Sequence, residues 1–369
     1  MNRRNFVRTA GLAGAAGLLG ACRNQATGGG DCGPGITAES VEWKMVTAWP
    51  RDFPALGTGA NRLAEKIGKL SNGRLTVKVY GGNELVPPFE VFDAVERGTA
   101  EMGHGAPYYW KGKVPSTQFF AGVPFGMTAR EMNGWLYYGG GLELWHEAYA
   151  PFGILPFPVG NSGVQMGGWF NKEINSMADL QGLKMRIPGL GGEVLSRAGG
   201  TPLTIPVAEI FTALQTGTID ATEWIGPFND QAAGLYRAAR YYYYPGWHEP
   251  GTVLEGLVNR EAFEALTPDL QEIVVTACKA STMDMLSEFS ARNGDALASL
   301  QEQGVEIRAF PEDVLAELRR LTEGVLEDIA GEDVMSAKVY ESFKAHLAKA
   351  RRWTEISETV MLQQRMAQG

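Results

Sequence analysis

The apolar residues of the first hundred positions indicate short strands that alternate with helices. WKMVTAW at 43–49 is a nearly continuous apolar run, typical of a buried strand, and residues 75–79 alternate between apolar and polar positions, as a half-buried strand does. Residues 60–70 place leucine and isoleucine on one helical face, and residues 88–97 form a second helix opened by a proline. Another short strand is expected at 101–105. This order predicts an α/β protein with layered sheets and crossover helices.

The rest of the chain continues this pattern and ends in helices. GVQMGGWF at 163–170 and KMRIP at 184–188 are expected strands, with Ser176 as a candidate N-cap of the turn between them. A helix follows Pro206, where apolar residues recur at helical spacing. A longer helical pattern covers residues 267–304, which is ~50 Å at ~1.5 Å per residue. A helix of that length either connects two lobes or reaches a partner subunit.

The N-terminal residues have the composition of an export segment. Arg3-Arg4-Asn5-Phe6-Val7 is a twin-arginine start, and the apolar run that follows is too short to span a membrane. Leu19-Gly20-Ala21-Cys22 resembles a lipobox, which predicts an export signal at 1–21 and a lipidated Cys22. The Gly-rich residues 22–41 would then form a flexible tether. The alternative is a soluble twin-arginine substrate with an incidental cysteine, and both place the mature protein in the periplasm.

Composition and charge restrict the partners and the metal sites. The 369 residues are enough for two or three lobes, and a net charge of −9 argues against a nucleic-acid partner. Besides Cys22 the chain contains only Cys32 and Cys278, which could form a disulfide in an oxidising compartment. Cys278 falls in an expected helix and is interpreted as a small apolar core residue. The sequence has four histidines and no cluster of Cys and His ligands.

The motifs of common enzyme classes are absent from the sequence. Gly160-Asn161-Ser162-Gly163 lacks the last glycine of a nucleophile elbow. Gly189-Leu190-Gly191 continues to Val194, where a dinucleotide-binding loop needs glycine. The sequence also contains no Walker loop and no HExxH motif. We therefore expect a protein that is not an enzyme.

Arg186 and Glu223 suggest a binding site for a small anion. Arg186 ends an expected strand, and its guanidinium can hold a carboxylate through two hydrogen bonds, although it could also be a surface arginine. Glu223 lies in a loop directly before Trp224, where an unpaired buried carboxylate would be costly. A cation would remove that cost, because hard cations bind carboxylate, amide and carbonyl oxygens. Gln165 could supply the amide oxygen, and the backbone of Trp224 the carbonyl.

Two segments, ADLQGLKMRIPG at 178–189 and AEIFTALQTGTIDATEW at 208–224, closely resemble the extracytoplasmic solute receptors of TRAP transporters. GVQMGGWF, EWIGPFND and YYYYPGWHEPG are most similar to the α-keto acid-binding subgroup of that family. The resemblance implies an α/β, two-lobe periplasmic binding protein with a hinge between the lobes and a long C-terminal helix that can swap between subunits of a homodimer. The parts expected are a first lobe at 42–160 plus about 252–300, a second lobe at 161–251, and a C-terminal helical region at 301–369.

The resemblance also implies roles for individual residues. Arg186 would receive the carboxylate of a small 2-oxo monocarboxylate such as pyruvate. Gln165, Glu223 and the carbonyl of Trp224 would hold a cation, sodium or calcium, that binds the carboxylate and keto oxygens of the ligand. Replacing Arg186 by Met is therefore expected to abolish binding and to leave the fold intact.

Further candidate residues around the ligand are, besides Gln165, the following four: Tyr109, Phe125, Trp247 and His248. Tyr109 matches a ligand-contacting tyrosine of the subgroup, although it could be a core aromatic residue like its neighbour Tyr108. His248 could bond the ligand or only brace its loop. Phe125 and Trp247 are expected as walls of the pocket.

Several alternatives remain open at this point. The ligand could be lactate bridged by calcium, or another carboxylate or sugar acid bound by Arg186 without a metal, with Glu223 paired to a lysine. A periplasmic enzyme acting on organic acids, with Glu223 as general base, is a further alternative. As a receptor, the protein would work with the membrane subunits of a TRAP transporter.

Overall fold

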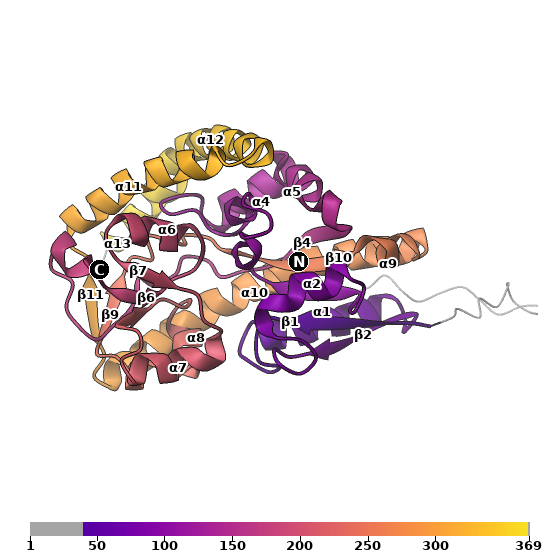
Figure 1. Ribbon diagram of the computed structural model, residues 1–369, viewed down its shortest axis with the longest axis horizontal. Helices are drawn as coiled ribbons and strands as arrows, with labels where there is room; N and C mark the ends of the chain where they lie inside the picture. Colours follow the sequence, from indigo (N-terminus) through magenta and orange to yellow (C-terminus); the bar gives the residue numbers. More distant parts are fainter. Residues whose placement is uncertain (1–39, 368–369) are drawn as a thin grey trace, which may run out of the picture. The chain divides into compact units, whose positions relative to one another are not determined.

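The computed structural model describes residues 40–367. The expectations about the export signal, the tether, Cys22 and Cys32 concern residues 1–39 and lie outside this range. The first of two sheets is built, in spatial order, from β2 (Leu75–Tyr80), β1 (Val41–Thr47), β3 (Met102–Gly105), β10 (Val253–Asn259) and β4 (Ile154–Asn161) (Figure 1). β1 is parallel to β2 and β3, whereas β10 is antiparallel to β3 and β4. The α/β prediction is confirmed.

The second sheet contains the strands between β4 and β10, together with β11, which follows β10 along the chain. In spatial order it consists of β11 (Glu306–Ala309), β9 (Tyr241–Tyr244), β5 (Gly168–Phe170), β8 (Ala221–Thr222), β6 (Lys184–Arg186) and β7 (Thr201–Leu203). β11 falls in the range expected to be only helical. It pairs in parallel with β9, with Ile307 opposite Tyr242, and so forms the edge of this sheet.

The helices cover both sheets. The α-helices are α1 (Gly57–Leu70), α2 (Val91–Glu96), α3 (Thr117–Ala121), α4 (Ala129–Tyr138), α5 (Gly141–Tyr149), α6 (Gly189–Arg197), α7 (Val207–Gln215), α8 (Pro227–Ala232), α9 (Arg260–Glu264), α10 (Pro268–Glu302), α11 (Glu312–Ala330), α12 (Val334–Thr354) and α13 (Val360–Met366). Short 3-10 segments lie at Pro88–Glu90, Pro107–Trp110, Ala150–Phe152, Met177–Leu180 and Leu235–Arg237, and a π-helical turn, Glu355–Thr359, joins α12 to α13.

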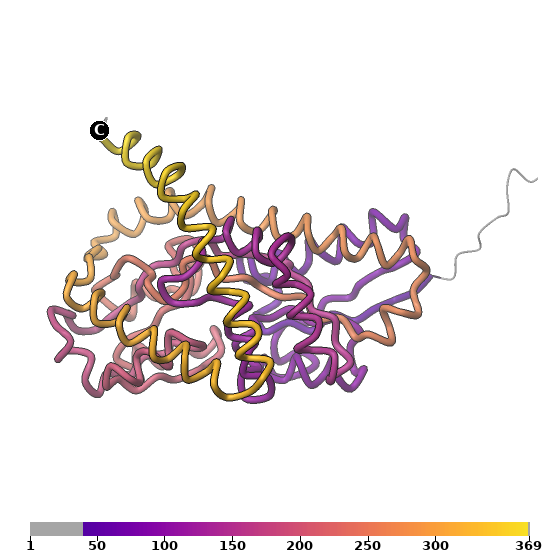
Figure 2. Tube along the Cα trace, turned by 90° about the horizontal axis from the view of Figure 1, so that it is seen from above, coloured from indigo at the N-terminus to yellow at the C-terminus, as the bar shows by residue number. Residues whose placement is uncertain are grey.

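The long helix α10 connects the two halves of the molecule. It packs against α1 and β4 beside the first sheet and against α8 beside the second (Figure 2). The expectation of one long helix is confirmed, and within the chain this helix braces both sheets. On another side, α11 packs against α6 while α12 packs against α4 and α5, so these two helices also contact both halves.

Three local expectations were wrong in extent. The strand expected at 184–188 ends at Arg186. Only Gly168–Phe170 of the segment 163–170 is a strand, because Gly163 has a φ of 70° and the backbone N–H groups of Gln165 and Met166 donate to loops instead of a neighbouring strand. The helix expected at 88–97 begins as the 3-10 turn Pro88–Glu90. Ser176 is an N-cap as expected, of the 3-10 turn Met177–Leu180, in a capping box with Asp179.

Apolar side chains fill the space between the sheets and their helices. Cys278 is buried in the core between α10 and the first sheet, and burial raises the pKa of its thiol to about 12, which agrees with its interpretation as a small apolar residue. Within residues 40–367 it takes part in no disulfide. None of the helices in that range is both long and apolar enough to cross a membrane.

Candidate functional site

The site is built where two parallel strands end next to each other. Arg186 is the last residue of β6 and Glu223 follows directly after β8, so adjacent strands deliver both side chains to one edge of the second sheet. The Arg186 Nη1 group donates to the Glu223 carboxylate, and the Glu223 backbone N–H donates to the Arg186 carbonyl at 3.1 Å. Both side chains are 1% exposed. The sequence analysis expected them in one pocket but did not predict this direct ion pair.

The surroundings keep Arg186 charged and held in place. Burial alone would lower the pKa of Arg186, but Glu223 together with Tyr109, Tyr108 and Glu249 outweighs this effect, and the pKa is raised. The guanidinium carbon lies 4.9 Å from the centre of the Trp224 ring, in a cation–π arrangement. Arg186 is therefore a buried fixed cation and not a surface arginine.

Tyr109 joins this cluster from the 3-10 turn after β3. Its hydroxyl oxygen accepts a hydrogen bond from Arg186 Nη2 at 3.3 Å. Burial raises the pKa of Tyr109 to about 12, so the hydroxyl keeps its proton and can donate it to an anion. Its neighbour Tyr108 is also buried, with its ring 5.0 Å from that of Tyr109.

The loop after β9 places His248 against Glu223. His248 Nε2 lies 3.3 Å from Glu223 Oε2, and the ring is fully buried with no hydrogen-bond partner for Nδ1 among the described residues. His248 was expected to bond the ligand or to brace its own loop; the contact with Glu223 is neither of these roles, and it places the ring where it can orient the Glu223 carboxylate. The adjacent Trp247 stacks on Phe125 at 5.9 Å between ring centres, and the Phe125 backbone N–H donates to the Trp247 carbonyl. Phe125 is thus connected to the cluster through Trp247.

Gln165 lies in the loop before β5, next to the segment that contains Trp224. The N–H of Met166 donates to the carbonyl of Ile225 at 2.9 Å, which brings the two segments together. The side-chain amide nitrogen of Gln165 donates to Glu249 Oε2 at 2.6 Å and to Ser162 Oγ at 3.1 Å. The amide oxygen is buried and has no partner among the described residues.

Glu249 is a buried carboxylate that the sequence analysis missed. It is 3% exposed and also accepts a hydrogen bond from the Thr252 hydroxyl at 2.6 Å. Burial, together with the nearby charge of Glu223, raises the pKa of Glu249 above its ordinary value. Glu249 directly follows His248, a candidate site residue, and this neighbour was the one signal for it in the sequence. Its contact with Gln165 could not be predicted from the spacing of the two residues along the chain.

Asp230 fixes the backbone conformation of residues 223–230. The sequence analysis did not identify this residue either. One of its oxygens accepts hydrogen bonds from the N–H groups of Ile225 and Gly226, at 3.1 and 3.0 Å. The other accepts from Trp169 Nε1 at 2.9 Å and from the Tyr242 hydroxyl at 2.8 Å. Burial raises the pKa of Asp230 to about 6. The carbonyl of Trp224 is therefore on a loop fixed from both sides.

The donor set fits a hard cation. Glu223 supplies a buried carboxylate and the backbone of Trp224 a carbonyl. Gln165 supplies a buried amide oxygen that has no hydrogen-bond partner within residues 40–367. Oxygen donors of these three kinds are the ones that sodium and calcium prefer. Among residues 40–367, no group of three or more His, Cys, Asp or Glu side chains lies close enough together to hold a metal ion without other donors.

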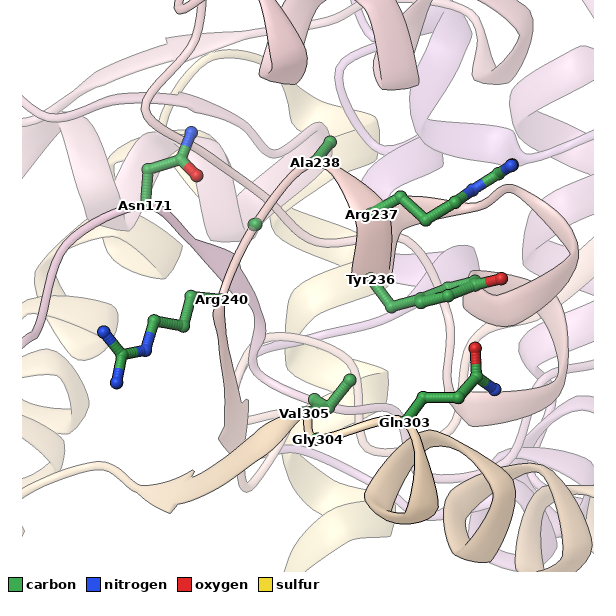
Figure 3. A pocket seen from close by; sticks show the side chains of 9 residues that line it. Asn171, Tyr236, Arg237, Ala238, Arg240, Gln303, Gly304 and Val305 are labelled. Carbon is green, nitrogen blue, oxygen red and sulfur yellow. The ribbon is translucent and has the colours of Figure 1, made fainter.

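A separate surface pocket of about 410 Å³ shares no residue with this cluster (Figure 3). Its two arginines point in opposite directions: Arg240 donates to Glu306 at 2.5 Å, and Arg237 stacks on Tyr236. Charged donors therefore do not converge in this pocket, as they do around Arg186. The buried cluster is the better candidate for binding a small anion.

Comparisons with known proteins identify the family of the chain. The family model described as bacterial extracellular solute-binding protein, family 7, matches residues 45–333. The monocarboxylate 2-oxoacid-binding periplasmic protein of Nostoc sp. is 41% identical over 360 residues, 97% of each chain. Two solved TRAP periplasmic solute binding proteins are each 44% identical, with a TM-score of 0.86 over 88% of this chain and 99% of theirs. The one from Colwellia psychrerythraea has bound calcium and pyruvate, and the one from Pseudoalteromonas atlantica bound sodium and pyruvate.

Proposed function

Because this chain belongs to the bacterial extracellular solute-binding proteins of family 7, the receptors of TRAP transporters, we propose that it captures a small 2-oxo monocarboxylate such as pyruvate. The observation that supports this most is the buried ion pair of Arg186 and Glu223. Its segments lie next to Gln165, whose buried amide oxygen has no partner in the part of the chain that the structure describes. A small anion offers little apolar surface, so its affinity must come from charged and polar groups shielded from water.

In this proposal the positive groups receive the ligand carboxylate. Arg186 offers its guanidinium and Tyr109 its protonated hydroxyl, and the two are hydrogen-bonded to each other at 3.3 Å. Trp224 covers one face of the guanidinium, while Trp247 and Phe125 form an apolar wall beside His248. His248 orients Glu223 through its contact with Oε2.

The carboxylate of Glu223 would repel an anionic ligand unless a cation lies between them. We propose that Glu223, Gln165 and the Trp224 carbonyl hold sodium or calcium, which supplies the positive charge that binds the carboxylate and keto oxygens. Both cations accompany pyruvate in the related structures. The arrangement agrees less well with a metal-free site in which Glu223 pairs with a lysine, because its partners here are Arg186 and His248.

Calorimetric titration with pyruvate tests this function. The protein, stripped of metal, is titrated in sodium buffer, in sodium-free buffer with EDTA, and in sodium-free buffer with calcium. We expect binding with sodium and none in the sodium-free EDTA buffer. Rescue by calcium alone would assign the site to calcium and would call for lactate as the next ligand. A lack of heat in all three buffers would contradict the 2-oxo acid assignment.

We also propose export by the twin-arginine route, based on Arg3 and Arg4, with lipidation at Cys22. The mass of the mature N-terminal peptide tests this, because a diacylglyceryl group on Cys22 and a free cysteine give different masses. An unmodified Cys22 in the periplasmic fraction would instead support the soluble form.

The C-terminal helices are proposed to form a homodimer. Trp353, Ile356, Met361 and Met366 are all more than half exposed, although they are large apolar side chains. They lie on the segment that runs from α12 through the π-helical turn into α13 and extends away from the rest of the described chain (Figure 2). Exposed apolar side chains gathered on one segment are typical of a protein interface.

A further inference from the structure

The residues of the proposed site are closed off from solvent between the two halves of the molecule. Arg186, Glu223 and His248 belong to the half that contains the second sheet, and each is at most 1% exposed. Tyr109 belongs to the half that contains the first sheet and lies against them through its bond to Arg186. A ligand that binds there has to enter and leave between the halves, so the contacts across this mouth have to break each time.

An ion pair crosses this mouth. Lys111 directly follows the 3-10 turn that carries Tyr109, and its Nζ group donates to the carboxylate of Glu193 in α6. The helix α6 begins at Gly189, shortly after Arg186, so both partners of the pair lie on segments that also supply site residues. The two side chains are 37% and 38% exposed, which places the pair at the surface and outside the buried cluster.

Uncharged contacts also join the two halves beside the site. The side-chain amide nitrogen of Asn229 donates to the carbonyl of Pro54 at 2.9 Å. The Phe53 ring meets the Trp224 ring edge-on, with 6.1 Å between their centres. Because these contacts carry no charge, reversing a charge at the mouth acts on the ion pair and leaves them in place.

We infer that the ion pair of Lys111 and Glu193 holds the two halves together around the bound ligand and slows its release. The inference rests on the proposed function, in which a carboxylate binds at Arg186. The pair can form only while the halves are together, so removing it makes opening easier. The first encounter with the ligand does not depend on the pair, and the effect is therefore on the dissociation rate and not on the association rate.

Lys113 provides a matched control for Lys111. Its side chain has the same exposure, 37%, but its ion pairs are with Asp93 and Glu96, which belong to the same half as Lys113 itself. Lys111→Met and Lys113→Met therefore remove the same charge from the same segment, and only the first removes a contact between the halves.

The release of radiolabelled pyruvate, chased with unlabelled pyruvate, measures the dissociation rate in the buffer in which the wild type binds. We expect Lys111→Met to release pyruvate about two- to fivefold faster than the wild type, since a partly exposed ion pair is weak. The association rate, obtained from the dissociation rate and the calorimetric Kd, should not change. Lys113→Met should release pyruvate at the wild-type rate, and equal rates for Lys111→Met and Lys113→Met would overturn the inference.

Charge reversal tests whether the two side chains act on each other. Glu193→Lys places two lysines opposite each other across the mouth, and we expect this variant to release pyruvate faster than Lys111→Met. The double variant Lys111→Glu/Glu193→Lys restores opposite charges, so its release should return toward the wild-type rate. Effects of the two reversals that simply add would overturn the inference. Thermal melting monitors folding, and Glu193→Gln replaces Lys111→Met if that variant does not fold.

Further measurements separate this inference from the proposed function. If the wild type needs a cation to bind pyruvate but the variants release it at the wild-type rate, only the role of the ion pair fails. If the wild type binds no pyruvate, the proposed function fails, and small-angle X-ray scattering of the protein alone then tests the pair. Glu193→Lys should have a larger radius of gyration than Lys111→Glu/Glu193→Lys, and equal values would overturn the inference.

Discussion

The contact between Arg186 and Glu223 explains how two charged side chains can be buried together. Each is 1% exposed, and each has a second partner, Tyr109 for the arginine and His248 for the glutamate. A buried ion pair contributes little net stability compared with apolar residues, but removing one partner leaves the other charge without compensation. The pair, which we propose to bind the ligand and its cation, is therefore also a point where a single substitution destabilises the fold.

Replacing Arg186 by Met should abolish pyruvate binding and also destabilise the fold. The burial of Arg186 changes the earlier expectation of an intact fold, because Glu223 would lose its guanidinium partner. We expect the free energy of unfolding to fall by about 3–5 kcal/mol, measured by urea unfolding at neutral pH. The double variant Arg186→Met/Glu223→Met, which removes both charges, should recover much of that stability while still failing to bind.

Arg320→Met serves as the control for this experiment. Arg320 pairs with Glu317 on the surface of α11, with 66% of its side chain exposed. Removing such a pair should change the free energy of unfolding by less than about 1 kcal/mol. An Arg186→Met protein as stable as the control would contradict the buried ion pair.

Glu255, in strand β10, makes the free energy of unfolding of the protein depend on pH. It is fully buried, with hydrogen bonds from Trp110 Nε1 and the Tyr149 hydroxyl, and burial raises its pKa from an ordinary 4.5 to about 8. Between these values the folded protein keeps a proton that the unfolded chain releases. The stabilisation is therefore complete below about pH 4.5 and is lost as the pH rises to about 8.

Glu255→Gln should remove this contribution. We expect the free energy of unfolding of the variant, minus that of the wild type, to increase from pH 5 to pH 8 by up to about 1.4 kcal/mol per pH unit. Urea unfolding at each pH measures the difference, in which the titration of Asp230 and Glu249 cancels because both proteins contain them. A difference that does not change with pH would contradict a raised pKa for Glu255.

The strands and helices with clear periodicity could be predicted from the sequence, and loops fixed by distant side chains could not. The long helix expected at 267–304 is α10, Pro268–Glu302. Arg186 was identifiable because it ends an expected strand, and Glu223 because an unpaired carboxylate next to Trp224 would be costly to bury. The family resemblance, and not the apolar pattern, predicted that the two residues share one pocket. Glu249 was not, since its bond to Gln165 joins residues 84 positions apart. The strand expected at 163–170 was too long for the same reason, because Gln165 is held by loop residues.

Ligand binding should stabilise the whole molecule only when a cation is present. A ligand that binds the folded state alone adds about 2.7 kcal/mol at 100 times its Kd. In sodium buffer, pyruvate should therefore raise the melting temperature by several degrees, and in sodium-free EDTA buffer it should not. The Glu223→Gln variant should show no shift in melting temperature that depends on the cation. A shift with pyruvate that is equal in both buffers for the wild type would contradict the proposed cation between Glu223 and the ligand.

The C-terminal segment should determine whether two molecules associate. α10 already contacts elements of both halves within one chain. Among residues 40–367, several of the exposed large apolar side chains lie on the last helices. We expect a dimer by light scattering after size exclusion, and a monomer for Ile356→Glu/Met361→Glu, because burying two carboxylates in an apolar interface is costly. Val334→Glu, at the exposed start of α12, should remain dimeric. A wild-type protein that is monomeric at all concentrations would contradict the proposed dimer interface of the last helices. Unchanged pyruvate binding by the Ile356→Glu/Met361→Glu monomer would mean that each subunit binds its ligand independently.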